Sequence, residues 1–373
     1  MSKKRATMKD VAARAGVGFK TVSRVINEEA GVSEQTAAKV RRAASELNYR
    51  RDMTAGNLRR AAGRTDSIGL LVASVDNEFD AKLHRAVEDA AKERRVSVFS
   101  SSTDEDADRE HQRALTLLAR RVDGLVLMPS SGDLAYLQHE LDLGTPVIAV
   151  DRPPKGICID TLMVDNESGA RDALTHLIEH GHRRVAVLAH LATLMTSAQR
   201  IAGARAAWAD AGLPADSLQV VDGVSTDEDT ARSLDALLDG ADPPTAVFAA
   251  RNEIAVGAVR ALQRRAQQHE IALIGFDDFG HADLLDPAVT VVRQDPARLG
   301  ELATERLFAR LDDRSLPVEQ LTVKTRLIRR RSCGCGARAG AGLGGGPGSD
   351  GSGGAPGSRG RAGPVREAST HRS

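Results

Sequence analysis

The sequence predicts an α/β protein with a small all-helical head and a body of two doubly wound lobes. Beyond residue 66, short β-branched runs such as SIGLLVAS, VDGLVLMP and TAVFAA alternate with amphipathic stretches such as HQRALTLLARR. Apolar runs that alternate with helices are typical of parallel sheets covered on both faces. There are about eight such runs, too many for one sheet of ordinary size. We expect two halves that meet near Asp151 to Asp165, where Pro153 and Pro154 favour a turn.

The first fifty residues predict three short helices. We expect the first over Met8 to Ala15, ended by Gly16, and the second from about Lys20 to Ile26. The third begins after Ser33, because serine is a favourable N-cap and the apolar residues that follow have helical spacing. A turn centred on Gly16 would join the first two helices, as a helix-turn-helix requires.

Four segments follow from these patterns. We expect a helix-turn-helix domain over residues 1–50, a basic hinge or linker over 51–65, the two-lobed body over 66–336, and a disordered Gly-rich tail over 337–373. Cys158, Cys333 and Cys335 are too few and too scattered for a disulfide framework. We expect Cys333 and Cys335 to mark the start of the tail as exposed thiols rather than to form a zinc site.

The charges are distributed unevenly although their sum is zero. Residues 1–64 carry 15 Lys and Arg against 6 Asp and Glu, a net charge of +9, so the remainder carries −9. A basic head on an acidic body suggests that the head meets a polyanion. The start of the chain has no apolar run behind its positive charges, and no segment approaches the roughly 20 apolar residues that span a membrane. We expect a cytoplasmic protein without a membrane partner, metal or cofactor.

The head closely resembles that of the LacI/GalR family of bacterial repressors. The resemblance rests on the segment MKDVAARAGVGFKTVSRVINEEAGVSEQTAAKVRRAASELNY, and it continues through VDGLVLMP, GHRRVAVL and GFDD to about Arg331. It implies a sequence-specific repressor, working as a homodimer on a pseudo-palindromic operator, whose affinity for double-stranded DNA is modulated by a small molecule. The fold implied is a helix-turn-helix head on a body like the periplasmic binding proteins.

The resemblance and the chemistry of base recognition together name the DNA-binding residues. Lys20 and Arg24 can donate to guanine, and Phe19 can touch a thymine methyl group. Thr21, Ser23 and Asn27 can form hydrogen bonds with phosphates. Tyr49 is the last residue of the head segment that resembles the family. Gly18 stands where the family has a capping serine. In the linker, Ala55 and Leu58 match a hinge helix that inserts a leucine into the minor groove, although Arg51 and Gly56 depart from its pattern. A plain linker is the alternative.

The resemblance also implies an effector cleft at the carboxyl ends of the strands. The matching positions are Phe79, Asp80, Asp151, Arg200, Arg251, Asp277 and Gln294. Paired carboxylates and arginines fit a polyhydroxylated ligand, typically a sugar. Three positions that are aromatic in the family hold Asp80, Ser225 and Pro296 instead. We expect a small polar effector, a sugar or, because Arg200 and Arg251 suit an anion, a sugar phosphate. The alternative is that Arg251 pairs with Asp277 or Asp80.

Three other functions stay open on the sequence. A solute-binding protein shares the body's fold, but the basic head and the missing signal peptide argue against it. An enzyme is possible on the same scaffold, but no nucleophile and base stand together. Finally, the cleft could bind nothing, with a partner protein controlling the regulator's affinity for DNA.

Overall fold

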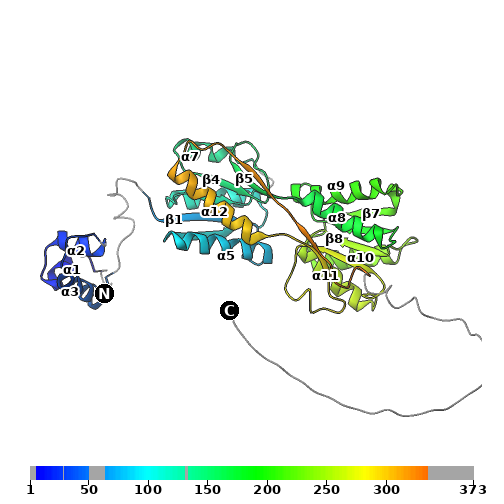
Figure 1. Cartoon of the computed structure of the whole chain (residues 1–373), viewed down its shortest axis with the longest axis horizontal. Coiled ribbons are helices and arrows are strands. Elements are labelled where there is room, and N and C mark those ends of the chain that lie inside the picture. The colour runs from blue at the N-terminus through cyan, green and yellow to red at the C-terminus, as the bar shows by residue number, and fades with distance from the viewer. Residues whose placement is uncertain (1–5, 28, 50–63, 131–132, 335–373) are drawn as a thin grey trace, which may run out of the picture. The chain divides into compact units, whose positions relative to one another are not determined.

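The computed structural model describes residues 6–27, 29–49, 64–130 and 133–334, and the linker positions Ala55 and Leu58 lie outside them. Its amino-terminal part is the expected set of three helices, α1 (Met8–Ala15), α2 (Phe19–Ile26) and α3 (Glu34–Glu46) (Figure 1). Gly16 ends α1 in a left-handed conformation with φ of 67°, which only glycine adopts at no steric cost. The three helices enclose a core of their own, made of Val11, Val22, Val25, Ala37, Val40 and Ala43.

The first lobe is a six-stranded sheet in the order β11-β5-β4-β3-β1-β2, with every neighbouring pair parallel. Its strands are β1 (Ser67–Val72), β2 (Ser97–Ser102), β3 (Leu125–Leu127), β4 (Val147–Val150), β5 (Asp160–Val164) and β11 (Gln320–Val323). Helices α5 (Glu78–Glu93) and α12 (Pro296–Asp312) pack on one face. Helix α6 (Ala107–Ala119) and the short η1 (Ala135–Leu137) and α7 (Gln138–Asp142) lie on the other.

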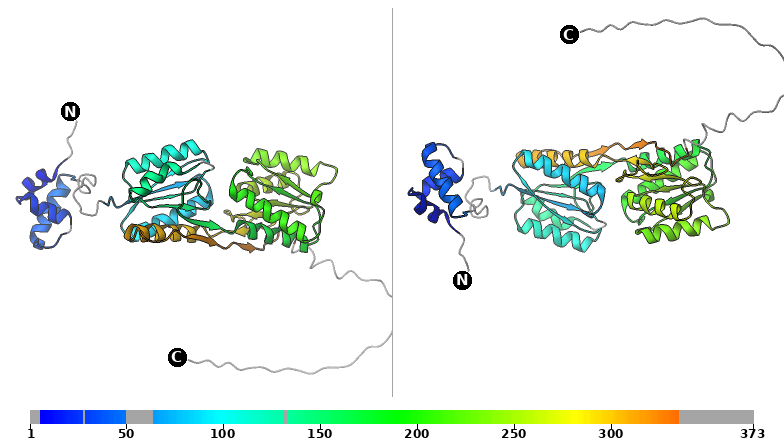
Figure 2. Two further views of the ribbon diagram at one scale, coloured as in Figure 1. Left: turned by 90° about the horizontal axis from the view of Figure 1, so that it is seen from above. Right: turned by 90° about the horizontal axis from the view of Figure 1, so that it is seen from below.

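The second lobe repeats this arrangement in the order β12-β10-β9-β8-β6-β7. Its strands are β6 (Val185–Leu188), β7 (Leu218–Val221), β8 (Ala246–Ala249), β9 (Ala272–Phe276), β10 (Thr290–Arg293) and β12 (Arg326–Ile328), of which β12 pairs antiparallel. Helices α8 (Asn166–Glu179) and α9 (Met195–Asp210) cover one face, and α10 (Asp227–Leu238) and α11 (Asn252–Arg264) the other. The short η2 (Ala215–Ser217) precedes β7. Figure 2 shows helices on both faces of each sheet.

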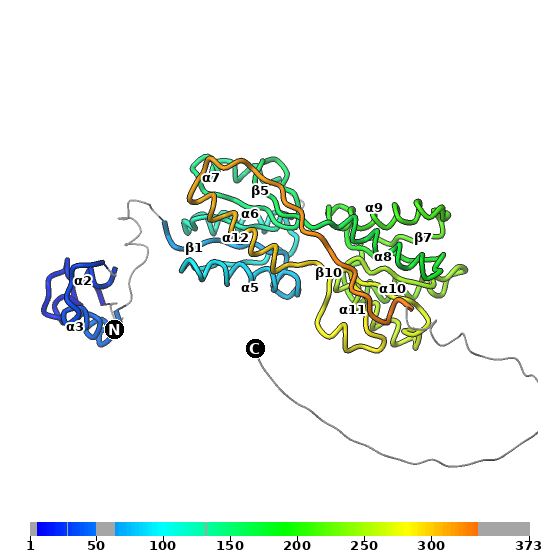
Figure 3. Tube along the Cα trace, in the orientation of Figure 1, coloured from blue at the N-terminus to red at the C-terminus, as the bar shows by residue number. Residues whose placement is uncertain are grey.

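The chain passes between the lobes in three described segments. The first is Asp165, between β5 and α8, at the end of the stretch over which the two halves were expected to meet. The chain then returns between β10 and α12 and crosses again between β11 and β12, as the gold and orange segments of Figure 3 show. Each lobe is therefore built from separate parts of the chain, and the crossings join the lobes at one side.

All eight predicted strands are present, and β5, β10, β11 and β12 were not predicted. The expectation for Cys333 was wrong. Its side chain is fully buried in the second lobe's core, because the chain folds back after β12 and the Ser332 hydroxyl donates to the Leu273 carbonyl at 2.5 Å. Among the described residues, no helix is long and apolar enough to cross a membrane.

Candidate nucleic-acid interface and ligand cleft

Helix α2 has one face in the core of the head and one face open. Val22 and Val25 are buried, while Lys20 is exposed and Phe19 keeps 44% of its surface accessible. Phe19 is an exposed aromatic side chain at the start of α2, where it is available for a contact in a complex. Helical spacing places Lys20, Ser23 and Arg24 away from the buried valines, whereas Phe19 lies one turn before Val22, at the edge of the open face.

The remaining head residues have roles within the fold. Gly18 is the N-cap of α2 and provides no side-chain hydrogen bond, as its identity requires. The Asn27 amide donates to Glu29 Oε1 at 3.1 Å and to Ser23 Oγ at 3.4 Å, so it is part of the end of α2. Tyr49 is half-buried and packs against the core of the head. The phosphate role expected for Asn27 and the role of Tyr49 stay predictions.

A polar cleft lies where the strands of both lobes end. All seven predicted effector residues line it together: Phe79, Asp80, Asp151, Arg200, Arg251, Asp277 and Gln294. The remaining cavity is small, about 50 Å³, because side chains from the two lobes meet across it. Of the three positions where aromatics were missing, only Asp80 is among the lining residues, and Ser225 and Pro296 are not.

Arg200 on α9 is held by its own protein surroundings. Its Nε donates to Asn166 Oδ1 and its Nη1 to the Ala250 carbonyl, both at 2.8 Å. The guanidinium lies 3.8 Å from the centre of the Phe276 ring and 3.7 Å from Asp277 Oδ2. Burial lowers the pKa of Arg200, and the charge of Asp277 opposes this effect. Two of the three guanidinium nitrogens of this arginine are thus engaged by Asn166, Ala250 and the nearby Asp277.

Asp277 and Gln294 form a second buried pair. Gln294 Nε2 donates to Asp277 Oδ1, which leaves Gln294 Oε1 buried without a hydrogen-bond partner among the described residues. Burial raises the pKa of Asp277, although the charge of Arg200 and the hydrogen bond from Gln294 favour the carboxylate. A ligand hydroxyl could donate to the free Gln294 oxygen.

Asp80 is a carboxyl group that burial drives towards its neutral form. Its side chain lies in the first turn of α5 and accepts a 2.7 Å hydrogen bond from the Ser74 amide. Burial outweighs this bond and raises the pKa of Asp80 to about 7. Near neutral pH a fraction of Asp80 is therefore protonated and can donate a hydrogen bond as well as accept one.

Glu105 and its partners were not predicted. Arg152 Nη2 lies 2.8 Å from Glu105 Oε1, His190 Nε2 lies 3.1 Å from Oε2, and Arg251 Nη1 lies 3.8 Å from Oε1. Burial alone would raise the pKa of Glu105. The hydrogen bond from His190 and the charges of Arg152 and Arg251 outweigh the effect of burial and lower this pKa to about 2. The sequence suggested Asp277 or Asp80 as the ion-pair partner of Arg251. This suggestion was wrong, because Arg251 forms ion pairs with Glu105 and, at 2.7 Å, with Glu253.

Several of these contacts connect the two lobes. Besides Glu105 with His190 and Arg251, the Asn77 amide donates to Asn252 Oδ1 at 3.2 Å. Glu78 accepts from the amide of Gly280 at 2.6 Å. Sequence reasoning could have found Arg152, which directly follows Asp151, but Glu105 lies in a polar loop with no periodic signal.

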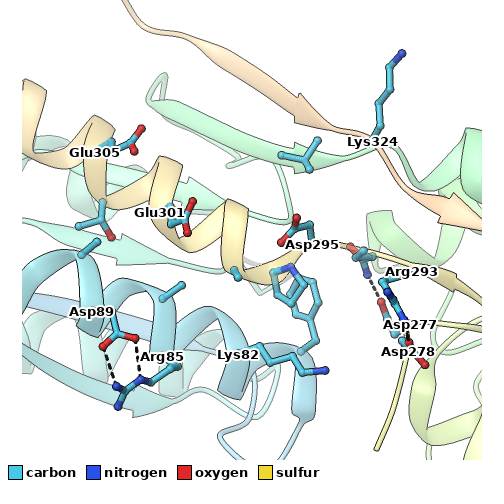
Figure 4. Close-up of a pocket in the computed structure, with 18 of the residues that line it drawn as sticks. Lys82, Arg85, Asp89, Asp277, Asp278, Arg293, Asp295, Glu301, Glu305 and Lys324 are labelled. Carbon is cyan, nitrogen blue, oxygen red and sulfur yellow. Dashed lines mark hydrogen bonds and ion pairs between the residues drawn. The ribbon is translucent and has the colours of Figure 1, made fainter. Parts of the chain in front are cut away.

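A larger hollow is an open groove of about 1230 Å³ between α5 and α12 (Figure 4). It shares Phe79, Asp277 and Gln294 with the cleft. Some of its exposed charges are paired with one another, for example Arg85 with Asp89 at 2.9 Å. In the cleft, Asp151 Oδ1 and Arg152 Nε, which do not line the groove, are buried and lack hydrogen-bond partners among the described residues. Because such atoms are costly to leave unpaired, the cleft is the candidate ligand site.

Comparison with known proteins gives the family. A model described as bacterial regulatory proteins of the lacI family matches residues 7–52. A second, described as periplasmic binding proteins and sugar binding domain of the LacI family, matches residues 65–326. The chain belongs to the LacI family. It has the helix-turn-helix DNA-binding domain and the sugar-binding-type body of this family, which confirms the predicted fold class.

Relatives agree along most of the chain. The ribose operon repressor of Escherichia coli strain K12 is 34% identical over 335 residues, covering 88% of this chain and 99% of the relative. The transcriptional repressor PurR of Pasteurella multocida is 30% identical over 334 residues, covering 88% and 98%. The crystal structure of the Lac repressor dimer bound to operator and an anti-inducer has a TM-score of 0.76 at 25% identity, covering 88% of this chain and 99% of that chain.

Proposed function

We propose that this LacI-family protein is a cytoplasmic transcriptional repressor and not an enzyme. It binds a pseudo-palindromic operator as a homodimer and changes its affinity for that operator when a small polar molecule, a sugar or sugar derivative, occupies the cleft. The observation that carries the proposal is the pairing of an open helix face at Phe19, Lys20 and Arg24 with a buried cleft that has unpaired polar atoms. Two identical heads would read two inverted half-sites.

The cleft's donors and acceptors support a polyhydroxylated ligand. The free oxygens of Asp151 and Gln294 accept hydrogen bonds, while Arg152 Nε and protonated Asp80 donate them. The name of the ribose operon repressor, one of the relatives, is consistent with a sugar.

Selection of bound sequences from random duplex DNA by the full chain tests the DNA-binding part. We expect enrichment of an inverted repeat of two half-sites, and loss of enrichment with Arg24→Ala. Enrichment of no sequence, with binding that depends on salt alone, would refute a sequence-specific repressor.

The hinge proposal concerns Leu58, which lies outside the described residues. We propose that Leu58 inserts into the minor groove, so that Leu58→Ala weakens binding to the selected operator at least tenfold more than binding to random duplex DNA. Equal losses on both duplexes, measured by fluorescence anisotropy, would support a plain linker instead.

A second candidate is a regulator of the same family whose cleft stays empty. The small cavity of about 50 Å³ and the hydrogen bonds that hold the lobes together favour it. It predicts that no sugar or sugar phosphate changes operator affinity and that substitutions in the cleft leave DNA binding unchanged.

A further inference from the structure

Three nitrogen-bearing side chains converge on the Glu105 carboxylate inside the cleft. Arg152 from the first lobe and Arg251 from the second both approach Oε1, at 2.8 and 3.8 Å, and His190 from the second lobe approaches Oε2 at 3.1 Å. Because His190 Nδ1 accepts from the Leu191 amide at 2.7 Å, a neutral imidazole carries its hydrogen on Nε2 and donates it to Glu105. Glu105 thus occupies an anion site that the protein itself has built.

The cations of this site are fixed more firmly than the anion. Arg152 is 8% exposed, and its Nη1 also donates to the Pro129 carbonyl at 3.3 Å. Arg251 is also held by Glu253. Glu105, in contrast, extends from the short loop between β2 and α6, and the contacts found for its side chain are with these three groups. A rotation of the Glu105 side chain would leave Arg152, Arg251 and His190 in place.

The surroundings point to a ligand rather than to a purely internal ion pair. Arg152 Nε and Asp151 Oδ1, next to the Glu105 site, are buried and have no hydrogen-bond partner among the described residues. The cavity of about 50 Å³ is lined by Glu105, Arg152, His190 and Arg251 as well as by the polyol-binding candidates Asp151 and Gln294. A molecule with hydroxyl groups on one side and an anionic group on the other would pair with both sets of residues. Its hydroxyl groups would meet Asp151 and Gln294, and its anionic group would meet Arg152, His190 and Arg251.

Arg200, one of the two arginines first suggested as an anion receptor, lines the cleft, but its Nε and Nη1 already donate to protein acceptors. It is engaged by Asn166, the Ala250 carbonyl and the Phe276 ring. The anion receptor is therefore the set around Glu105, of which only Arg251 was among the predicted residues.

We propose that Glu105 is a built-in competitor for a phosphate group of the effector, which displaces the Glu105 carboxylate and binds Arg152, Arg251 and His190. A phosphate monoester fits three donors better than a carboxylate does, because it offers three terminal oxygens and up to two negative charges. Since Arg152 and Arg251 belong to different lobes, the bound phosphate would replace Glu105 in joining them. The inference rests on the proposed effector function of the cleft and narrows the effector to a phosphorylated sugar.

Inorganic phosphate tests the site without knowledge of the sugar. We expect the full-length Glu105→Gln protein to bind phosphate at least tenfold more tightly than the wild type, measured by ³¹P line broadening. The added substitution Arg251→Asn should remove that gain. Asp104→Asn is the matched control, because Asp104 is the exposed neighbour of Glu105 and pairs with Arg109 outside the cleft. Equal phosphate affinity in the wild type and Glu105→Gln would overturn the proposal.

Calorimetric titration with matched pairs of sugars separates this inference from the proposed function. The pairs are ribose and ribose 5-phosphate, glucose and glucose 6-phosphate, and fructose and fructose 6-phosphate. We expect at least one phosphate to bind tenfold or more tightly than its parent sugar, with the preference lost in Arg251→Asn. Binding of a neutral sugar without gain from its phosphate would overturn the inference and leave the effector function standing. Binding of no compound, together with retained operator binding, would contradict both the inference and the effector function.

Discussion

At the scale of single residues, the DNA-binding proposal depends on side chains of α2 that the core of the head does not use. Lys20→Ala should weaken binding to the selected operator by about 1–3 kcal/mol, because a lysine on the recognition helix donates to base edges. Lys39→Ala on α3 is the matched control, since Lys39 is also an exposed helical lysine of the head. Fluorescence anisotropy of a labelled duplex measures both. Equal effects of the two substitutions would contradict a specific role for Lys20.

Asp80 gives a pH-dependent prediction. Its pKa in the folded protein is about 7, whereas the ordinary value is 3.8, so between these pH values the folded state holds a proton that the unfolded state has lost. The stabilisation is fully present below pH 3.8 and is lost as the pH rises through 7. The wild type should lose up to about 4 kcal/mol of unfolding free energy over this window through Asp80.

Asp80→Asn checks this expectation, because asparagine does not ionise and its oxygen can still accept from the Ser74 amide. In urea unfolding at pH 5 and pH 8, the variant should lose less stability than the wild type on going to the higher pH. Asp76→Asn, an exposed position nearby, should behave as the wild type does. The same loss in Asp80→Asn and wild type would show that Asp80 does not titrate near 7.

The sequence predicted seven residues of the cleft but not Glu105. The seven predicted residues come together because each follows a strand or lies in the first two turns of a helix at the carboxyl edge of a parallel sheet, and such edges meet between the lobes. Glu105 follows a strand as well, but nothing in the loop STDEDAD distinguishes its carboxylate from those of its neighbours. Its partners come from residues 47, 85 and 146 positions away in the chain, so only the folded structure reveals them.

At the scale of elements, the two glycines that flank the turn between α1 and α2 have opposite roles. Gly18 has ordinary backbone angles as the N-cap of α2, and a Cβ there would meet nothing within 4 Å. Gly18→Ser should therefore stabilise α2 by a few tenths of a kcal/mol through a new cap. Gly16 has φ of 67°, so Gly16→Ser should destabilise the head by about 1 kcal/mol.

Hydrogen exchange of the α2 amides in the full-length protein measures both effects. Protection should increase in Gly18→Ser and decrease in Gly16→Ser. A decrease in both variants would mean that the turn tolerates no side chain at either position, contrary to the open space around Gly18.

The sequence predicted a strand correctly where an apolar segment is also buried in the sheet. The buried runs β1, β4, β6 and β8 were recognisable because, apart from Ser67 at the start of β1, they contain no polar side chain. Strands β11 and β12 were missed because QLTV and RLI are mostly exposed or half-buried edge strands. Their place in the sheets depends on the second and third crossings between the lobes, which no short segment encodes.

At the scale of the whole molecule, three crossing segments and a set of side-chain contacts join two lobes built alike. We propose that the lobes take two relative positions, so that a ligand that binds one of them more tightly shifts the balance. The ligand changes operator affinity only as far as its own affinity differs between the two states. The cleft and the head are thus expected to be coupled reciprocally.

The most direct test of the account is fluorescence anisotropy of the selected operator duplex with the full-length protein, titrated with sugars and sugar phosphates. We predict that at least one compound changes operator affinity fivefold or more, and that Arg251→Asn, which alters the cleft and not the head, reduces this response. An operator affinity that no compound changes, in the wild type and in the variant alike, would contradict a repressor controlled through its cleft.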